Sequence, residues 1–529
     1  MKKTKLLAML LAGTMVVSAF AGCSSSGDAD SDNANTGSNP DSSASTDSGK
    51  DSKVTKDEIV ILQGADIKSL DPVVSNEANT HVILRHMYNR LLYMDPQGNL
   101  HPELAEEWEQ VSPTEYHFKL RQGVKFHNGD ELTAEDVKFT LERCLESPRI
   151  AMKIEAISEV VIDNDYEITL KLSEPFAPLI PNLAHPGVSI LNKKIVSDPN
   201  YKFDTAVGTG SMKFVEWVPN DHYTLERYED YFEGPCKTGK LTCRVIPEGS
   251  SRTIALENGE ADLVISVDAV DINRVTENAN LHTETFTGNT LDFLAFNMKQ
   301  KPFDDIRVRQ AINYAINKEN IVDVVLEGYG VVATSVYAPT VRGFNEELTG
   351  YEYNLEKAKE LMKEAGYENG FSTQVYTSGE ARNRTAQLIQ DNLAQIGIEV
   401  EIMLMDSGAF LDAMDNGQCP MYIYGWNCNS MDPDECIYPL FHTDCWGATG
   451  NRGFYSNPKV DELIIKARTS TDDNERMALY KEIQAMIMED APWAALDAKS
   501  SCVSMNKDLK GFEVFPSGAH WYNNLYYEN

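Results

Sequence analysis

The sequence predicts a soluble body of mixed α/β class with more than one lobe, and three observations support this. The stretch from about residue 58 onward is far longer than one ordinary domain. Apolar residues recur every second position in some segments and every three or four positions in others, which predicts strands mingled with helices. After the N-terminal segment, no second apolar run is long enough to span a membrane.

Strand patterns occur in several places along this body. Residues 116–120 and 168–172 alternate apolar and polar side chains, as half-buried strands do. The segments VEIMLM (400–405) and MYIYGW (421–426) are also typical of strands, and both lie close to helical patterns. We therefore expect strands and helices to share the same lobes.

Helix boundaries are marked by capping residues. Thr133 followed by Asp136 predicts a helix start with an acid placed to accept from the cap backbone. Asn317 and Asn354 each precede an apolar stripe of helical period, so we expect both to cap helices. Gly366 follows the second stripe and is expected to end that helix.

The N-terminal segment predicts export. Residues 1–22 combine a basic start with a short apolar run and small residues, the pattern of a secretory signal peptide. The end of this segment, Phe-Ala-Gly-Cys, resembles the lipobox of bacterial lipoproteins, although Phe20 stands where that box usually has Leu. The resemblance implies that Cys23 becomes the lipid-carrying N-terminus. Residues 23–57 would then be a disordered tether rich in Ser and Asp, because this composition cannot bury a core.

Composition excludes some functions and leaves others open. The formal net charge is −34, which argues against nucleic-acid binding because that function needs basic patches. Nine cysteines are few for 529 residues, so the fold does not depend on a disulfide framework. Some of them could pair outside the membrane, but their spacing does not assign the pairs.

Catalytic and metal motifs are weak. GPCKTGK (234–240) matches most of a phosphate-binding loop, but Leu241 stands where Ser or Thr should be and a strand pattern follows, so we expect a turn. The chain contains no HExxH, no GxSxG and no paired CxxC, and we expect neither enzyme activity nor a cofactor. A zinc site is an open alternative to a disulfide such as Cys436–Cys445 or to buried thiols, and its candidate ligands are Cys428, Cys436, His442 and Cys445.

Four stretches resemble blocks of one protein family, in the family's order. They are AEEWEQVSPTEYHFKLRQGVKFHNGDELTAEDVKFTLER (105–143), VGTGSMKFVEWVPNDHYTLERYEDYFEG (207–234), FNMKQKPFDDIRVRQAINYAINKENIV (296–322) and YNLEKAKELMKEAGYENGF (353–371). The family is that of the family 5 extracellular solute-binding proteins, the oligopeptide, dipeptide and nickel type receptors of ABC importers.

This resemblance implies a two-lobed fold of the periplasmic-binding-protein-like kind (class II, large cluster), with a hinge and an extra inserted domain. By the family layout, lobe I comprises residues 58–88, 190–286 and 500–529. The extra domain comprises 89–189, and lobe II comprises 287–499. Closure of two rigid lobes would both bury a ligand and signal its presence to a membrane partner.

The stretch GWNCNSMDPDECIYPLF (425–441) resembles the family block at the wall of the ligand cleft. In peptide-binding members, an Asp of this block pairs with the free ammonium of the peptide. An ungapped match places Asn429 at that position, and Ile423 stands where some oligopeptide binders have Arg. The fold resemblance therefore holds while the peptide clamp is altered.

Further residues near this block are candidates for ligand contact. Trp426 offers an apolar wall or stacking face, and core packing is its alternative role. Asn427 and Tyr424 complete the polar and aromatic set, while Asp432 and Glu77 are acids that could compensate for the missing Asp. Asp434 and Glu435 are further acids of this kind, and the sequence does not show which of them point inward.

Together these observations predict a monomeric, lipid-anchored receptor on the extracellular face of the cell membrane, or its periplasmic side where an outer membrane exists. It would deliver a peptide or peptide-like ligand to the permease and ATPase of an ABC importer. One alternative is the same scaffold binding a metal chelate, haem or an oligosaccharide. Another is a surface sensor without an importer.

Overall fold

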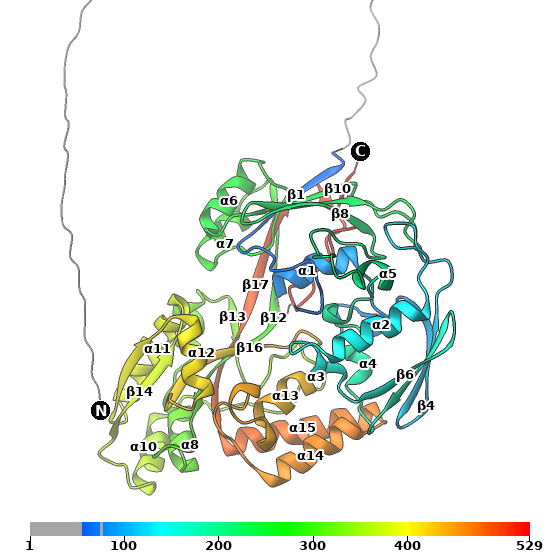
Figure 1. Cartoon of the computed structure of the whole chain (residues 1–529). Coiled ribbons are helices and arrows are strands. Elements are labelled where there is room, and N and C mark those ends of the chain that lie inside the picture. The colour runs from blue at the N-terminus through cyan, green and yellow to red at the C-terminus, as the bar shows by residue number, and fades with distance from the viewer. Residues whose placement is uncertain (1–55, 75–77, 529) are drawn as a thin grey trace, which may run out of the picture. The chain divides into compact units, whose positions relative to one another are not determined.

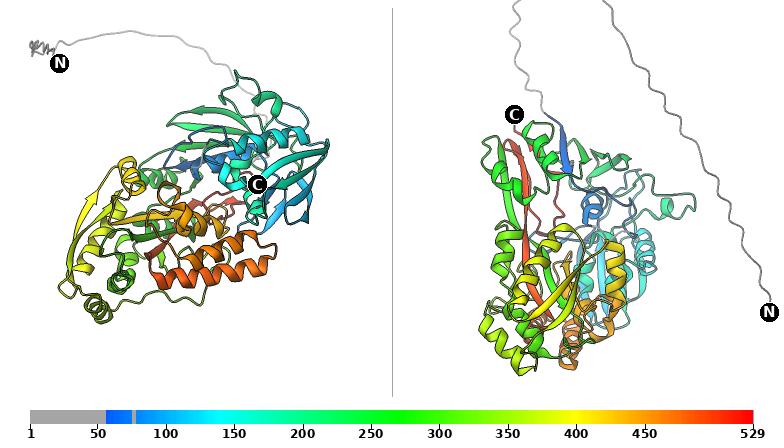
Figure 2. Two further views of the ribbon diagram at one scale, coloured as in Figure 1. Left: turned by 60° about the horizontal axis from the view of Figure 1, so that its bottom comes forward. Right: turned by 90° about the vertical axis from the view of Figure 1, so that its left-hand side faces the viewer.

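Two long strands organise the computed structural model, which describes residues 56–74 and 78–528. The strand β12 (Leu281–Phe296) pairs antiparallel with β17 (Trp493–Asn506) along most of their length. The pairing is irregular between Thr287 and Leu291. Figure 1 shows both strands running from the group of strands around β1 to the group around β16, and the right view of Figure 2 shows them side by side.

The two long strands belong to the largest sheet in the described part of the chain, which has eleven strands. Its order is β15-β14-β16-β12-β17-β11-β1-β10-β9-β8, and β13 pairs with β17 outside this path. The other strands are β1 (Glu58–Gln63), β8 (Met212–Val218), β9 (His222–Arg227), β10 (Lys240–Val245), β11 (Leu263–Val264), β13 (Gly330–Val332), β14 (Phe371–Thr377), β15 (Ile398–Leu404) and β16 (Met421–Asn427).

One end of this sheet is covered by helices on both faces. One face packs on α8 (Ile306–Ala315), α9 (Lys318–Val325), α10 (Leu355–Glu364) and α11 (Glu380–Ala394). The other face packs on α12 (Ser407–Asp415), α13 (Asp434–Phe441), α14 (Pro458–Thr469) and α15 (Asp473–Asp490). Two buried apolar clusters result, one on each face, as a doubly covered sheet requires.

The other end of the sheet has its own apolar clusters. These combine β1 and β10 with α1 (Ala78–Met87), α6 (Gly249–Glu257) and α7 (Ala269–Thr276). The buried apolar residues at the two ends form separate clusters, and β12 and β17 run from one end to the other. This arrangement is the structural basis of the two lobes. The residue ranges given above for lobe I, the extra domain and lobe II remain a prediction.

A separate four-stranded sheet in the described residues has the order β4-β5-β7-β6. Its strands are β4 (Ala105–Ser112), β5 (Glu115–Leu120), β6 (Ile157–Asn164) and β7 (Glu167–Leu172). The helix α2 (Ala134–Leu145) packs on it through Val137 and Leu141. Short elements complete the fold: β2 (Leu92–Met94), β3 (Leu100–Pro102), α3 (Ala151–Ile154), α4 (Leu179–Asn182), α5 (Lys193–Val196), β18 (Leu509–Lys510) and β19 (Tyr526–Tyr527).

The predicted caps are confirmed. Asp136 accepts from the backbone N–H of Thr133 at 3.0 Å, Asn317 accepts from that of Asn320 at 2.9 Å, and Asn354 accepts from that of Lys357 at 3.0 Å. The segment resembling a phosphate-binding loop leads into β10, so the strand expected after it is confirmed. A turn ends at the start of this segment, where the N–H of Gly234 donates to the carbonyl of Tyr231 at 2.8 Å, and the following residues are irregular.

Candidate functional site

The carboxyl ends of three parallel strands meet at one edge of the sheet. The strands β14, β15 and β16 run parallel, and α11 and α12 begin just after β14 and β15. In open α/β sheets, ligands bind in the crevice outside the carboxyl ends of the strands. Asn427 ends β16 and therefore lies at this edge, with Asn429 two residues beyond it.

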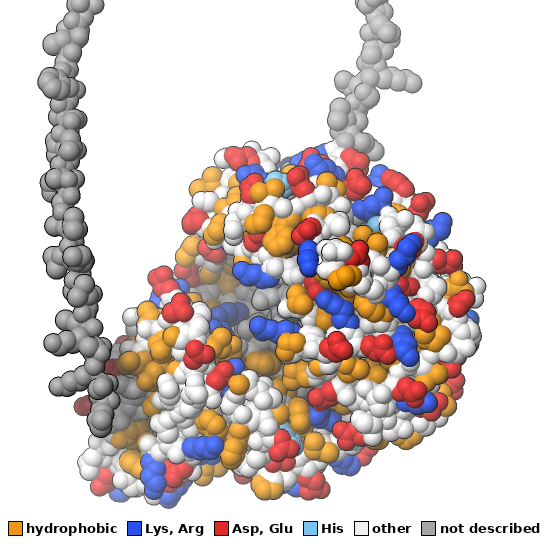
Figure 3. Space-filling view, viewed as in Figure 1, with side chains coloured by type: hydrophobic (Ala, Val, Ile, Leu, Met, Phe, Trp, Pro, Cys, Tyr) orange, Lys and Arg blue, Asp and Glu red, His pale blue; other side chains and the backbone are white. Residues whose placement is uncertain are grey.

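This edge faces a hollow in the surface. Figure 3 shows the hollow between the region of α6 and α7 and the region of α11 and α12, over β12, β13 and β17. Lys and Arg side chains stand on its walls. The hollow thus lies over the strands that connect the two cores.

The loop after β16 is tied to the long strand β12. The backbone N–H of Cys428 donates to the carbonyl of Asn289 at 3.3 Å, and the Asn289 side chain donates back to the Cys428 carbonyl at 2.8 Å. The side-chain amide of Asn427 donates to Oδ1 of Asn429 at 3.1 Å. Asn427 and Asn429 are both half-buried, so the structure brings these two predicted site residues together at the strand end.

The aromatic residues of β16 lie on the other face of the strand. Trp426 is half-buried, and its indole N–H donates to the Glu435 carbonyl at 3.0 Å. The Tyr424 ring lies 5.5 Å from the Arg382 guanidinium and 5.7 Å from that of Arg452. Both aromatic side chains pack against the same apolar cluster, so each has one face in the core.

Trp426 also lines a cavity of about 290 Å³. The opposite wall comes from residues 149–182, which belong to the part of the chain around α3 and α4. Lys153 from that wall forms an ion pair with Glu435 at 3.0 Å, and the backbone N–H of Ala177 donates to the carbonyl of Arg468 at 2.7 Å. The cavity is therefore closed by contacts between two parts of the chain that are far apart in sequence.

The acids that follow Trp426 are already paired. Asp432 is 1% exposed and forms a two-point ion pair with Arg476, at 2.5 and 2.6 Å. Burial alone would raise the pKa of Asp432, but Arg476 holds it below its usual value. Asp432 therefore stays ionised and lies in the wall of the Trp426 cavity with its charge neutralised.

Its neighbours have partners as well. Asp434 lies 3.1 Å from Nε of Arg468 and accepts from the Tyr480 hydroxyl, and burial raises its pKa. Burial opposes the ionisation of Glu435, yet Lys153 keeps the pKa of this carboxyl lowered. These acids hold the loop in place and have no vacant charge to offer a ligand ammonium. Glu77, the fourth predicted acid, lies outside the described residues.

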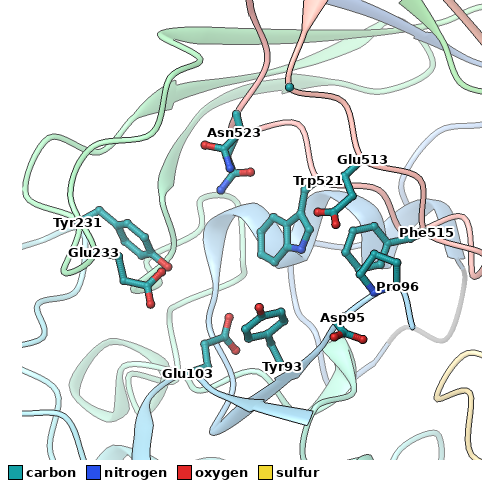
Figure 4. A pocket seen from close by; sticks show the side chains of 12 residues that line it. Tyr93, Asp95, Pro96, Glu103, Tyr231, Glu233, Glu513, Phe515, Trp521 and Asn523 are labelled. Carbon is teal, nitrogen blue, oxygen red and sulfur yellow. The ribbon is translucent and has the colours of Figure 1, made fainter. Parts of the chain in front are cut away.

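A second cavity, of about 280 Å³, combines acids with aromatic rings (Figure 4). Its walls carry the side chains of Tyr93, Asp95, Glu103, Tyr231, Glu233, Glu513, Phe515 and Trp521. It lies close to the loop after β16. The carbonyl of Pro516, the residue after Phe515 of the cavity wall, accepts from the N–H of Asn289 at 3.2 Å, and Asn289 in turn binds Cys428 of that loop. On the other side, a Cβ at Gly98 would lie 3.3 Å from Cγ of Arg342 and 3.8 Å from Cε of Met431, so both side chains come close to this turn.

The four acids of this cavity differ in their state. Glu103 is buried, which raises its pKa, and it pairs with Arg90 at 2.8 Å. Despite partial burial, hydrogen bonds from His101 and Asn99 lower the pKa of Asp95 to about 2.

The remaining two carboxylates, those of Glu233 and Glu513, are exposed and form no ion pair within residues 56–74 and 78–528. Free carboxylates beside aromatic rings suit a cationic group, and the Arg85 guanidinium already lies 4.0 Å from the centroid of the Trp521 ring. Sequence reasoning missed this cavity, because its residues come from three segments far apart in the chain and follow no motif.

The cysteines of the described region are buried free thiols, and burial raises the pKa of those at 144, 236 and 243 to about 12, 11 and 12. Among the same residues, no three metal-ligating side chains come together. Within residues 56–74 and 78–528, none of the helices has the length and apolarity needed to cross a bilayer. Cys23 and the predicted signal peptide lie outside the described residues.

Comparisons with known proteins agree on one family. The model of the bacterial extracellular solute-binding proteins, family 5 (middle region), matches residues 99–448. The glutathione-binding protein GsiB of Pectobacterium atrosepticum is 31% identical over 472 residues, which cover 86% of this chain and 91% of that protein.

Two solved structures illustrate the fold match. DppA of Helicobacter pylori, in complex with the peptide STSA, is 30% identical with a TM-score of 0.78, covering 89% of this chain and 98% of that one. The oligopeptide-binding protein AppA of Bacillus subtilis, in complex with a nonapeptide, is 27% identical with a TM-score of 0.75, covering 89% and 99%.

Proposed function

The chain belongs to family 5 of the bacterial extracellular solute-binding proteins, and we propose that it captures a peptide or peptide-like solute between its lobes. Members of this family are two-lobed substrate-binding proteins of ABC importers and not enzymes. Three relatives of this chain bind glutathione, the peptide STSA and a nonapeptide, and these ligands support a peptide-like solute here.

The observation that carries the proposal is the position of the Asn427–Asn429 pair. It stands at the carboxyl edge of a parallel sheet, beside the strands that join two separate cores. Because the apolar clusters at the two ends are separate, rotation about β12 and β17 would close the hollow without repacking either end, and contacts between the ends such as Lys153–Glu435 would adjust. Two half-buried amides at this position offer donors and acceptors to a peptide backbone.

Recognition of the ammonium would differ from that of family members with an Asp at the position of Asn429. The nearby acids Asp432, Asp434 and Glu435 are neutralised by cations of this chain. The exposed carboxylates of Glu233 and Glu513 have no such partner among the described residues, and aromatic rings accompany them in the cavity of Figure 4. We propose that this cavity receives the amino end of the solute.

The anchor and the partners complete the proposal. A lipid on Cys23 would hold the receptor on the extracellular face of the membrane, because two or more acyl chains make a stable anchor. The closed receptor, as a monomer, would then dock on the permease of an ABC importer, whose ATPase drives uptake. The predicted tether, residues 23–57, would give the body the reach to do so.

A thermal-shift screen of the purified protein tests the choice of solute. The arms are defined tripeptides, glutathione, a nickel–histidine complex and malto-oligosaccharides. A ligand at a hundred times its Kd stabilises the native state by about 2.7 kcal/mol, which is readily seen as a rise in Tm. We expect the rise with peptides or glutathione. A rise confined to the nickel complex or the sugars would contradict a peptide-like solute.

A further inference from the structure

Two buried acids face each other across the long strands. Asp292 of β12 pairs in register with Asp497 of β17, and the two are 4% and 2% exposed. Neither residue belongs to the sites described above. Two carboxyl groups this close and this dry cannot both ionise without compensation.

Asp292 has that compensation. Its carboxylate accepts from Nη2 of Arg382 at 2.9 Å and contacts Nζ of Lys499 at 2.7 Å. Burial opposes ionisation, but Lys499 and Arg382 together lower the pKa of Asp292 below its ordinary value. Asp292 is therefore a fixed negative charge that holds both cations in position.

Asp497 lacks it. Its Oδ1 has no hydrogen-bond partner in the described part of the chain, although the atom is buried. Burial, with the adjacent charge of Asp292, raises the pKa of Asp497 to about 7. The other charged groups that face it are Lys499 of its own strand and Arg382 of α11, while β13, which also pairs with this segment, has no titratable side chain.

The charges of the cluster do not cancel while Asp497 is protonated. Arg382 and Lys499 contribute two positive charges and Asp292 one negative charge, which leaves a surplus of one positive charge. If Asp497 ionises, the surplus disappears. The protonation of Asp497 therefore decides whether the cluster attracts an anion.

The two cations reach solvent on the side of the candidate site. Their side chains are 26% and 35% exposed, and Arg382 lies in the first turn of α11, at the carboxyl edge of the sheet. Gly425 lets the pair lie across β16, because a Cβ at this position would collide with both Asp292 and Arg382. Trp426, the next residue, belongs to the predicted site.

We propose that Arg382 and Lys499, held by Asp292, bind the terminal carboxylate of the solute, and that Asp497 takes up a proton from solvent when it docks. The proposal rests on the proposed function and adds to it the chemistry of one end of the ligand. A docked carboxylate would add a negative charge near Asp497, which favours the protonated acid. Solute binding and protonation are then linked, each promoting the other.

The test uses two equimolar tripeptide mixtures, one with free carboxyl ends and one with carboxamide ends. Titration calorimetry at pH 7 in phosphate and in Tris measures affinity and proton uptake together, since these buffers differ in ionisation enthalpy. We expect the acid mixture to bind at least about tenfold more tightly than the amide mixture. Because the pKa of Asp497 lies near 7, this residue is about half protonated at pH 7 before the solute binds. Binding of the acid mixture should therefore take up about half a proton.

Variants assign these effects to the cluster. Arg382→Gln should remove the preference for the acid mixture over the amide mixture. Arg382→Lys should restore part of the preference if the charge matters, which also guards against a folding defect. Asp497→Asn should keep acid binding and abolish proton uptake. Arg384→Gln, at an exposed position of the same helix, is the matched control and should change nothing.

The remaining outcomes distinguish failure of the carboxylate-binding inference from failure of the proposed peptide-binding function. Equal binding of the two mixtures to the wild-type protein, or proton uptake that persists in Asp497→Asn, would overturn the inference and leave the proposed function standing. Failure of both mixtures to bind would overturn the proposed peptide-binding function, and the inference with it.

Discussion

Asp432 and Arg476 form a two-point ion pair in which both side chains are almost fully buried, at 1% and 3% exposure. The pair joins the start of α13 to the first turn of α15, directly after the loop of Asn429. It fixes the position of the candidate site without facing the solute as a free charge.

Asp432→Asn should therefore destabilise the fold. Removing one partner leaves the Arg476 guanidinium buried without its counter-charge, which costs about 3–5 kcal/mol. Urea unfolding followed by circular dichroism measures the difference. Glu360→Gln is the control, because it breaks the solvent-exposed Lys357–Glu360 pair and should leave the stability almost unchanged. A stable Asp432→Asn protein that had lost only solute binding would show that Asp432 contacts the ligand directly.

Asp497→Asn should stabilise the protein at pH 8 and leave it unchanged at pH 4. The native pKa of Asp497, about 7, lies above the unfolded value of about 3.9, so between these values the native state holds the extra proton. Stability accordingly falls as the pH rises from 4 to 7, and the neutral amide avoids this loss. The gain at pH 8 is at most about 4 kcal/mol. Equal Tm values for the two proteins at pH 8 would contradict this.

Asn429→Asp should raise the affinity for peptides with a free amino end. Asn429 already accepts from Asn427 through Oδ1, so an aspartate keeps this hydrogen bond and adds a negative charge. A hydrogen bond to a charged group contributes about 1.5–3 kcal/mol, which predicts a gain of about ten- to a hundredfold in Kd. Calorimetry with a tripeptide and its N-acetyl form measures it. Affinity that is level or lower for the free amine would place residue 429 away from that end of the solute.

Glu513→Gln should weaken binding of the same free-amine tripeptide and spare the N-acetyl form. Glu513 is an exposed acid beside the rings of Figure 4, and without its charge an ammonium loses an electrostatic partner. A loss of about three- to tenfold is expected. Glu368→Gln removes an exposed acid elsewhere and serves as the matched control. Identical losses for the two tripeptide forms would show that the cavity does not receive the amino end.

The helix starts could be predicted from the sequence, because contacts between residues close together in the chain determine them. The side chains of Asn317 and Asn354 cap helices because the orphan N–H groups lie two or three residues away, within the reach of any such residue. The family blocks likewise indicated the two-lobed fold, which the matches to solved structures confirm.

The site was less predictable because its parts meet only through the fold. The sequence placed Asp432, Asp434 and Glu435 near the candidate cleft but did not reveal their partners Arg476, Arg468 and Lys153, which lie 34 or more residues away in the chain. The cavity of Figure 4 and the pair of Asp292 with Asp497 also depend on contacts between distant segments. No local pattern records such contacts.

Small-angle X-ray scattering, with and without a saturating tripeptide, tests the central claim most directly. If the two cores rotate about β12 and β17 to enclose the solute, the radius of gyration should fall on binding and the scattering curve should change shape. Superimposable curves from a protein that calorimetry shows to be saturated would contradict closure of the lobes on the ligand.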